Sequence, residues 1–142
     1  MTLLKVVGIN QVMEKMAKRR ASLIDRKKVN GWAIIAIDQW IQKNFEGEGK
    51  LAVGGWQPLA PATIARRRGA GSVKILQDTG ALKGRWKHFY DKRRGWIRSG
   101  VPYAAAHHFG GRLPKRPLIP TRDQIMPTLI KIYGQFVKVS VK

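Results

Sequence analysis

The chain has 142 residues, with 28 Lys or Arg against 8 Asp or Glu, so its formal net charge is +20. It contains no cysteine, which excludes a disulfide framework, thiolate metal sites and a cysteine nucleophile. With 44% apolar residues it is too hydrophobic for a disordered basic tail, and we expect one domain, residues 1–142, with its own core. No stretch is long and apolar enough to cross a bilayer, and the first residues lack a secretory pattern, so we expect neither a membrane span nor export.

The first third of the chain predicts two helices. Apolar residues at helical spacing follow a possible Asn10 cap and predict a helix over about 10–21. A broader apolar stripe from Val29 to Phe45 predicts a second helix over about 26–45. The glycines of Glu46-Gly-Glu-Gly end that helix and open a loop that reaches Gly55.

The middle of the chain predicts short elements and a hairpin. The proline-containing segment after Trp56 is expected to be extended, followed by a short helix over about 61–68. Residues 75–83 predict a turn around Thr79-Gly80 that leads into a strand. Two aromatic-rich segments between Leu82 and Ser99 flank the polar Asp91-Lys-Arg-Arg, a pattern typical of a β-hairpin with a basic tip.

The last third predicts a short helix over 102–109, stopped by Gly110-Gly111, and a proline-rich extended surface arm over 112–120 that could lie across a neighbouring subunit. Beyond it, Thr121 and Gln124 could open a helix with a capping box, whereas the valines of 137–141 alternate with polar residues as in a strand. We predict a short helix and then a final strand. The expected fold is α+β: two N-terminal helices packed on a small, mostly antiparallel sheet, with the extended arm.

Residues that could carry out catalysis are sparse and scattered. Asp38, Asp78 and Asp91 fall in separate elements, so they form no carboxylate cluster of the kind that a two-metal nuclease needs. His107 and His108 are adjacent, so on a helix they point about 100° apart and are poorly placed to share a metal ion. No glycine-rich phosphate loop is present. We therefore expect no enzyme, no cofactor and no metal; a small nuclease that uses Asp78 or His107 ranks far behind the other functions.

The basic residues gather in five clusters. Any one cluster is most simply a solvated face, but five of them with so few acids between favour contact with a polyanion. No zinc finger, basic zipper or RNA-recognition motif is present, so sequence-specific readout is not expected. Aromatic residues of the hairpin could stack on exposed bases, although aromatics on strands more often pack in a core. The clusters are Lys18-Arg-Arg, Arg26-Lys-Lys, Arg66-Arg-Arg, Lys92-Arg-Arg and Lys115-Arg.

Four segments occur in a specific order between about residues 30 and 120. They are Trp56-Gln-Pro-Leu-Ala-Pro-Ala-Thr-Ile-Ala-Arg-Arg-Arg, Ile75-Leu-Gln-Asp-Thr-Gly-Ala-Leu, Val101-Pro-Tyr-Ala-Ala-Ala-His-His-Phe-Gly-Gly and Leu113-Pro-Lys-Arg-Pro-Leu. In this order they resemble the phage virion morphogenesis family of tail-completion proteins. The chain departs from the family pattern at His108, where Gln is usual, and at Leu118, where an aromatic residue is usual.

The resemblance implies a structural protein of the phage neck, made in the host cytoplasm and built into the virion. Such a protein would form a homo-oligomeric ring of six or twelve copies that joins the DNA-filled head to the tail. Its partners would be a head adaptor or portal-side protein, a tail terminator protein and, without sequence preference, the genomic duplex DNA. Because roughly 30 Å of duplex presents only about 18 phosphates, most of the positive charge of such a ring is expected to face acidic neighbouring proteins.

The site residues that follow from this interpretation form two groups. For DNA we expect the hairpin tip and the cluster at the end of the short helix: Lys92, Arg93, Arg94, Arg66, Arg67 and Arg68. Subunit or partner contact is expected of Trp56, Tyr103, His107, Phe109, Lys115, Arg116 and Pro117, although the aromatic residues among them are also explained by packing. The alternative is a cytoplasmic protein that binds nucleic acid without sequence preference, with tight, salt-sensitive binding.

Overall fold

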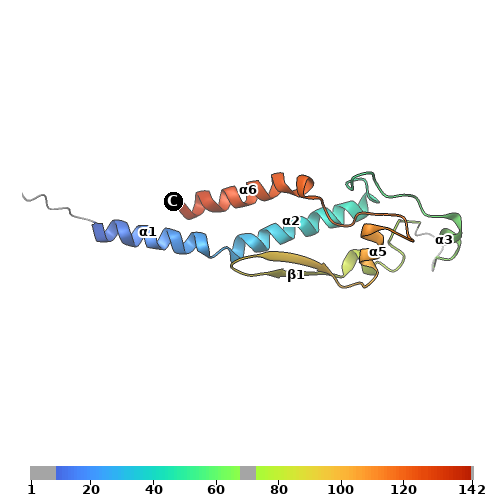
Figure 1. Ribbon diagram of the computed structural model, residues 1–142, viewed down its shortest axis with the longest axis horizontal. Helices are drawn as coiled ribbons and strands as arrows, with labels where there is room; N and C mark the ends of the chain where they lie inside the picture. The colour runs from blue at the N-terminus through green and yellow to red at the C-terminus, as the bar shows by residue number, and fades with distance from the viewer. Residues whose placement is uncertain (1–8, 68–72, 142) are drawn as a thin grey trace, which may run out of the picture.

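The long helix α2, Lys27–Glu46, is the central element of the molecule (Figure 1). The computed structural model describes residues 9–67 and 73–141. Helix α1, Ile9–Ile24, precedes α2 and is separated from it by a bend at Asp25 and Arg26. Both predicted N-terminal helices are thus confirmed. Their roles differ, because α2 packs against the hairpin strands and the C-terminal helix, whereas α1 projects beyond the body and contacts the C-terminal helix.

The predicted hairpin is confirmed as a two-stranded antiparallel sheet. Strand β1, Trp86–Tyr90, pairs with β2, Gly95–Ser99, in a register that joins Phe89 to Trp96. One face of the hairpin lies on α2, where the Tyr90 ring fills the space beside Gly31. Asp91 shapes the tip because its Oδ1 accepts hydrogen bonds from the backbone N–H groups of Arg93 and Arg94.

The end of the chain is one helix, α6, Arg122–Val141, so the predicted final strand is wrong. The capping box of the alternative interpretation is present, since the Thr121 N–H donates to Gln124 Oε1 at 2.9 Å. The helix continues through Pro127 and lies along α2 (Figure 1), where the Tyr133 hydroxyl donates to Asn30 Oδ1. The α+β fold is confirmed, with a sheet of two strands in the described residues.

The core gathers around the C-terminal half of α2. Phe45 and the Trp56 ring meet edge to face at 5.0 Å. Gly49 in the intervening loop has φ +86°, and a Cβ at this position would overlap the Trp56 ring. Burial of each large apolar side chain contributes about 1.5–3 kcal/mol. The buried cluster consists of Ile41, Phe45, Ala52, Trp56, Leu82, Val101, Ala104 and Leu118.

Short helices connect these parts. Helix α3, Pro61–Ala65, starts at the predicted proline but is shorter than predicted. Helix α4, Ala81–Gly84, was not expected: the turn at Gly80 leads into this single helical turn, and only then into β1. Helix α5, Ala104–Phe109, ends at Gly110 as predicted.

The proline-rich segment 112–120 lacks regular structure, as predicted, but it is not a free surface arm. Arg116 and Leu118 within it are buried. Asn44 Nδ2 and Trp56 Nε1 both donate to the Pro117 carbonyl, at 3.1 and 2.8 Å. Proline has no backbone N–H, so a proline-rich segment forms few regular backbone hydrogen bonds. Side chains supply the donors for its carbonyl groups instead, and these bonds hold the segment against its own core.

Candidate functional site

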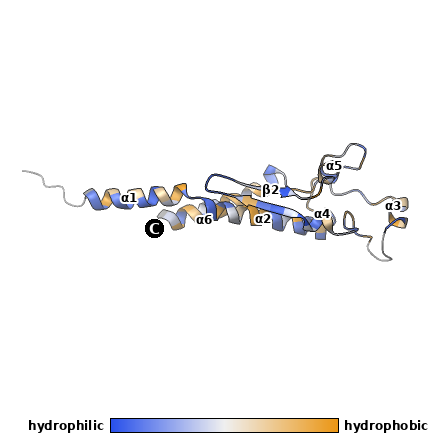
Figure 2. Ribbon diagram, turned by 90° about the horizontal axis from the view of Figure 1, so that it is seen from below, coloured by the Kyte–Doolittle hydropathy of each residue, from blue (hydrophilic) through white to orange (hydrophobic). Residues whose placement is uncertain are grey.

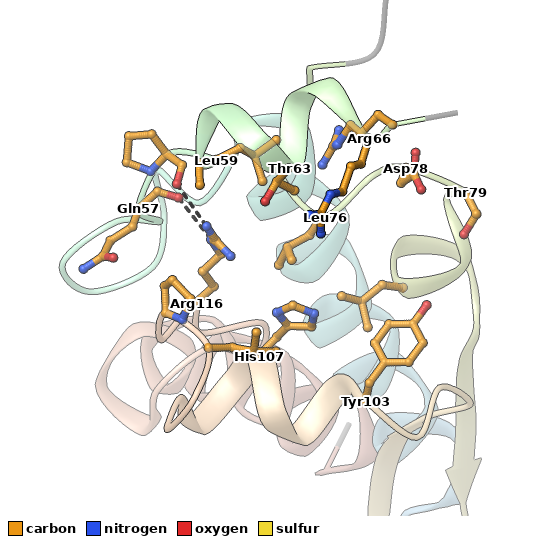
Figure 3. Close-up of a pocket in the computed structure, with 16 residues that line it drawn as sticks. Gln57, Leu59, Thr63, Arg66, Leu76, Asp78, Thr79, Tyr103, His107 and Arg116 are labelled. Atoms are coloured by element: carbon orange, nitrogen blue, oxygen red, sulfur yellow. Dashed lines mark hydrogen bonds between the residues drawn. The ribbon is translucent and has the colours of Figure 1, made fainter. Parts of the chain in front are cut away.

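A groove of about 730 Å³ lies at the end of the molecule away from α1 (Figure 3). It is lined by parts of all four segments that carry the resemblance, which are far apart in sequence. Gln57 to Arg67 form one wall with α3, residues 76–82 a second, Tyr103 and His107 of α5 a third, and residues 113–116 the last. The groove is therefore the place where the fold brings these segments together.

Arg116 is the structural centre of the groove. Its side chain is buried, and the guanidinium donates to the carbonyl oxygens of Gln57 (3.0 Å) and Pro58 (3.1 Å), the two dashed bonds of Figure 3. Burial, and then the nearby Arg67 charge, lower the pKa of Arg116 from its ordinary value. Arg116 thus joins the proline-rich segment to the segment before α3 and places a positive charge under the groove.

His107 stands beside Arg116 in the groove wall, and its Nδ1 atom is buried without a hydrogen-bond partner among the described residues. Burial, and then the Arg116 charge, lower the pKa of His107, so the ring is neutral at neutral pH. The neighbouring His108 has a structural role instead. Its Nδ1 accepts the Leu118 N–H at 3.0 Å, and burial followed by the Lys115 charge lowers its pKa.

The lining of the groove combines cationic and apolar side chains. Arg66 is exposed on one side, and Asp78 is the single acid among the described residues of the lining. Leucines supply the apolar surface: Leu59, Leu76, Leu82 and Leu113. Guanidinium groups beside apolar side chains suit a segment with both carboxylate and apolar side chains.

The acids and histidines do not form a metal centre. Over residues 9–67 and 73–141, no three His, Asp or Glu side chains come together in a way that could hold a metal ion. The three aspartates singled out in the sequence stay apart: Asp38 lies 3.6 Å from His88 Nε2, Asp78 lines the groove and Asp91 shapes the hairpin tip.

The two clusters predicted to face DNA lie at different ends of α2. Arg66 and Arg67 line the groove, whereas the hairpin tip lies next to the bend between α1 and α2, where Lys92 Nζ is 3.5 Å from Asp25. Arg93 is exposed, and Arg94 Nε is 4.0 Å from Asp91. Arg68 lies outside the described residues. The structure therefore does not bring these clusters into one surface.

The residues predicted for partner contact divide by exposure. Tyr103 and Phe109 are exposed, as is Lys115, and the half-buried His107 lines the groove. Trp56 and Arg116 are buried against residues of this same chain, so packing within the chain accounts for both side chains.

Pro117 is half-buried, and its carbonyl accepts two hydrogen bonds within the chain. Sequence reasoning missed several other groove residues, among them Gln57, Thr63, Leu76 and Leu113. Those named share one property. All four lie in the resembling segments, so the ordered segments were the signal that could have found them.

Two further findings bear on function. No helix in the described part of the chain has the length and apolar character needed to span a membrane. No family model, curated protein or solved structure matches the chain.

Proposed function

We propose that this chain is a tail-completion protein of a tailed bacteriophage, a ring-forming component of the neck that joins the DNA-filled head to the tail. The observation that carries the proposal is the convergence of the four resembling segments on one groove. Each segment taken alone is weak evidence for the family, because the resemblance lies in the order of the four. Their meeting in space is what a shared binding site requires, because residues distant in sequence must lie close together to contact one partner.

The charge of the chain supports the same function. A net charge of +20 on one small domain is tolerated best between anionic neighbours, such as acidic faces of adjacent virion proteins and the DNA within the channel. In this proposal, the groove takes an acidic, partly apolar segment of a head-side or tail-side protein. The basic residues outside the groove guide docking and contact DNA without reading its sequence.

Deletion of the gene from a phage that encodes it tests the proposal directly. We expect filled heads and free tails that do not join, and joining is expected to return when the purified protein is added to the mixture. Mass spectrometry of intact virions should find the chain in a ring-like copy number, and cryo-electron microscopy should place it at the head–tail junction. Infectious virions without the chain would refute the proposal.

A charge reversal in the groove tests where the partner binds. Arg66→Glu is expected to block joining, because the exposed guanidinium at the groove edge would be replaced by a repelling carboxylate. Arg19→Glu is the matched control, since it makes the same charge change on the exposed surface of α1. Equal loss of joining in both variants would mean that only total charge matters.

The second candidate function, a cytoplasmic protein that binds nucleic acid without sequence preference, rests on the net charge alone. It predicts that the chain is absent from virions and that binding to DNA or RNA falls steeply with salt. Loss of Lys92, Arg93 and Arg94 distinguishes the two functions. Their replacement by Ser keeps the Asp91 turn, which uses backbone N–H groups, and in the neck proposal it lowers infectivity with folding intact.

A further inference from the structure

The outward face of the hairpin carries two stacked aromatic rings among cationic side chains, and we propose that this face binds single-stranded nucleic acid by stacking on unpaired bases. The inference does not depend on the neck proposal, because it rests on a different surface and is tested by a different measurement. The face is distinct from the groove.

The direction of each side chain follows from the contacts of the opposite face. Gly95 lies against Ile34 of α2, His88 lies beside Asp38, and Trp86 and Ile97 pack on the core. Side chains alternate along a strand, so the strand residues between these positions point away from α2. These outward residues are Lys87, Phe89, Trp96 and Arg98.

The two outward aromatic rings are stacked and accessible. Phe89 and Trp96 are cross-strand partners whose ring centroids lie 5.2 Å apart with an interplanar angle of 9°. They remain 37% and 42% exposed. The Arg94 guanidinium lies 5.0 Å from the centre of the Trp96 ring, so three planar groups lie against one another. Aromatic and guanidinium planes of this kind are the surfaces on which unpaired bases stack.

Arg94 lies near Asp91, but the two other cations of this face have no acidic counterpart within the described residues. Lys87 and Arg98 are directly opposite each other in the register, an arrangement of like charges that destabilises a hairpin. Neither side chain has an ion pair with an acid within the described residues, in contrast to Lys92 at the tip. An anionic group placed between them would relieve the repulsion, and a nucleic-acid backbone supplies one phosphate for every base.

A concavity adjoins the stack. Its volume is about 580 Å³, and it lies between the hairpin and the start of α5, with Lys87, Phe89 and Arg98 on one side and Pro102 and Ala105 on the other. Its lining contains no acid. A base that stacks on Phe89 would therefore have room beside it and cations within reach of its phosphate.

Unpaired nucleic acid fits this face better than a duplex or an acidic protein. In a duplex the base faces are covered by their neighbours, so exposed aromatic rings would contribute little to binding. An acidic protein would use the cations but has no general need for the stacked rings. Dependence of binding on both kinds of side chain is thus the property that identifies the occupant.

The test uses fluorescence anisotropy of labelled oligo(dT), with a labelled duplex of equal phosphate number for comparison. Phe89→Ala and Trp96→Ala are each expected to weaken oligo(dT) binding roughly 5- to 100-fold, the range found when one stacking residue is removed. Duplex binding should change much less. Phe89→Leu and Trp96→Leu serve as second variants that keep an apolar side chain without an aromatic plane, in case the alanine variants unfold.

Trp32→Ala is the matched control. Trp32 is also 42% exposed and also lies near a cation, Lys28 Nζ at 5.2 Å, but it is on α2. It should bind oligo(dT) like the parent. Likewise Lys87→Ser should weaken binding more than Lys92→Ser, whose lysine is paired with Asp25. Unchanged binding in the folded aromatic variants, equal loss in Trp32→Ala, or equal competition by poly-glutamate and oligo(dT) would each overturn the proposal.

Discussion

The groove end and the hairpin end of this molecule reach order by different means. At the groove end the chain is mostly irregular, and buried polar side chains hold it in place: Asn44, fully buried, donates to the Pro117 carbonyl and accepts the Ala52 N–H. At the hairpin end, the chain forms regular helices and strands and leaves large apolar side chains exposed. Hence the first end is sensitive to single core substitutions, whereas the second can present its side chains to partners.

The largest effect is expected within the proline-rich segment. Leu118→Ala should lower the free energy of unfolding by about 2–5 kcal/mol, because Leu118 is 1% exposed in the core. Leu113→Ala, in the same segment but 42% exposed, should cost far less. Urea denaturation of both variants measures the difference. Equal costs would show that the segment is not anchored on the core as described.

A glycine pair sharpens the same comparison. Gly49 and Gly54 both have positive φ, but a Cβ at Gly49 would lie 2.1 Å from the Trp56 ring, whereas nothing lies within 4 Å at Gly54. Both alanine variants carry the strain of the left-handed conformation, about 1–2 kcal/mol. Gly49→Ala should lower the free energy of unfolding by about 1–3 kcal/mol more than Gly54→Ala does, because its methyl group would overpack against the Trp56 ring. Thermal unfolding of the two variants measures this difference. Equal unfolding midpoints would contradict this account.

Acidification should weaken the groove end specifically. Burial lowers the pKa of His107 and of His108 below the ordinary 6.5, so between the folded and unfolded pKa values the unfolded chain binds more protons. The contribution of the two neutral histidines to the free energy of unfolding is therefore fully present above pH 6.5. It is lost as the pH falls through that value toward the folded pKa. His108→Asn keeps an acceptor for the Leu118 N–H and should reduce the loss. If the urea midpoint of this variant fell with pH as steeply as that of the parent, His108 would be excluded as a source of the pH dependence.

The smallest effect is expected on α1. Met16 is 65% exposed, so Met16→Ala should change the free energy of unfolding by less than about 0.5 kcal/mol. Figure 2 shows apolar and polar residues mixed along this projecting helix. Urea denaturation at two protein concentrations checks the expectation. A larger, concentration-dependent loss would mean that another copy covers α1 in solution.

The sequence predicted the elements where a local pattern decides the structure. The apolar stripe of α2, the Thr121–Gln124 capping box and the aromatic segments of the hairpin are all local, and all are present. The final strand failed because five alternating residues are too short a pattern to oppose a helix that is already capped and lies along α2.

Long-range contacts account for what the sequence could not predict at the candidate site. The prolines of 112–120 indicated an exposed segment, but a partner for the Pro117 carbonyl is supplied by Asn44 and Trp56, more than sixty residues away. The groove was predictable only as an ordered set of segments. The exposure of Phe89 and Trp96 also depends on which hairpin face meets α2, and strand alternation alone does not fix that choice.

The length of α2 has a mechanical consequence. One end of this helix supports the hairpin tip through Asn30, whose Nδ2 donates to the Asp91 carbonyl, and the other end supports the groove through Asn44. Twenty residues at about 1.5 Å each span roughly 30 Å. Two macromolecules held at these ends would be kept apart by a stiff spacer.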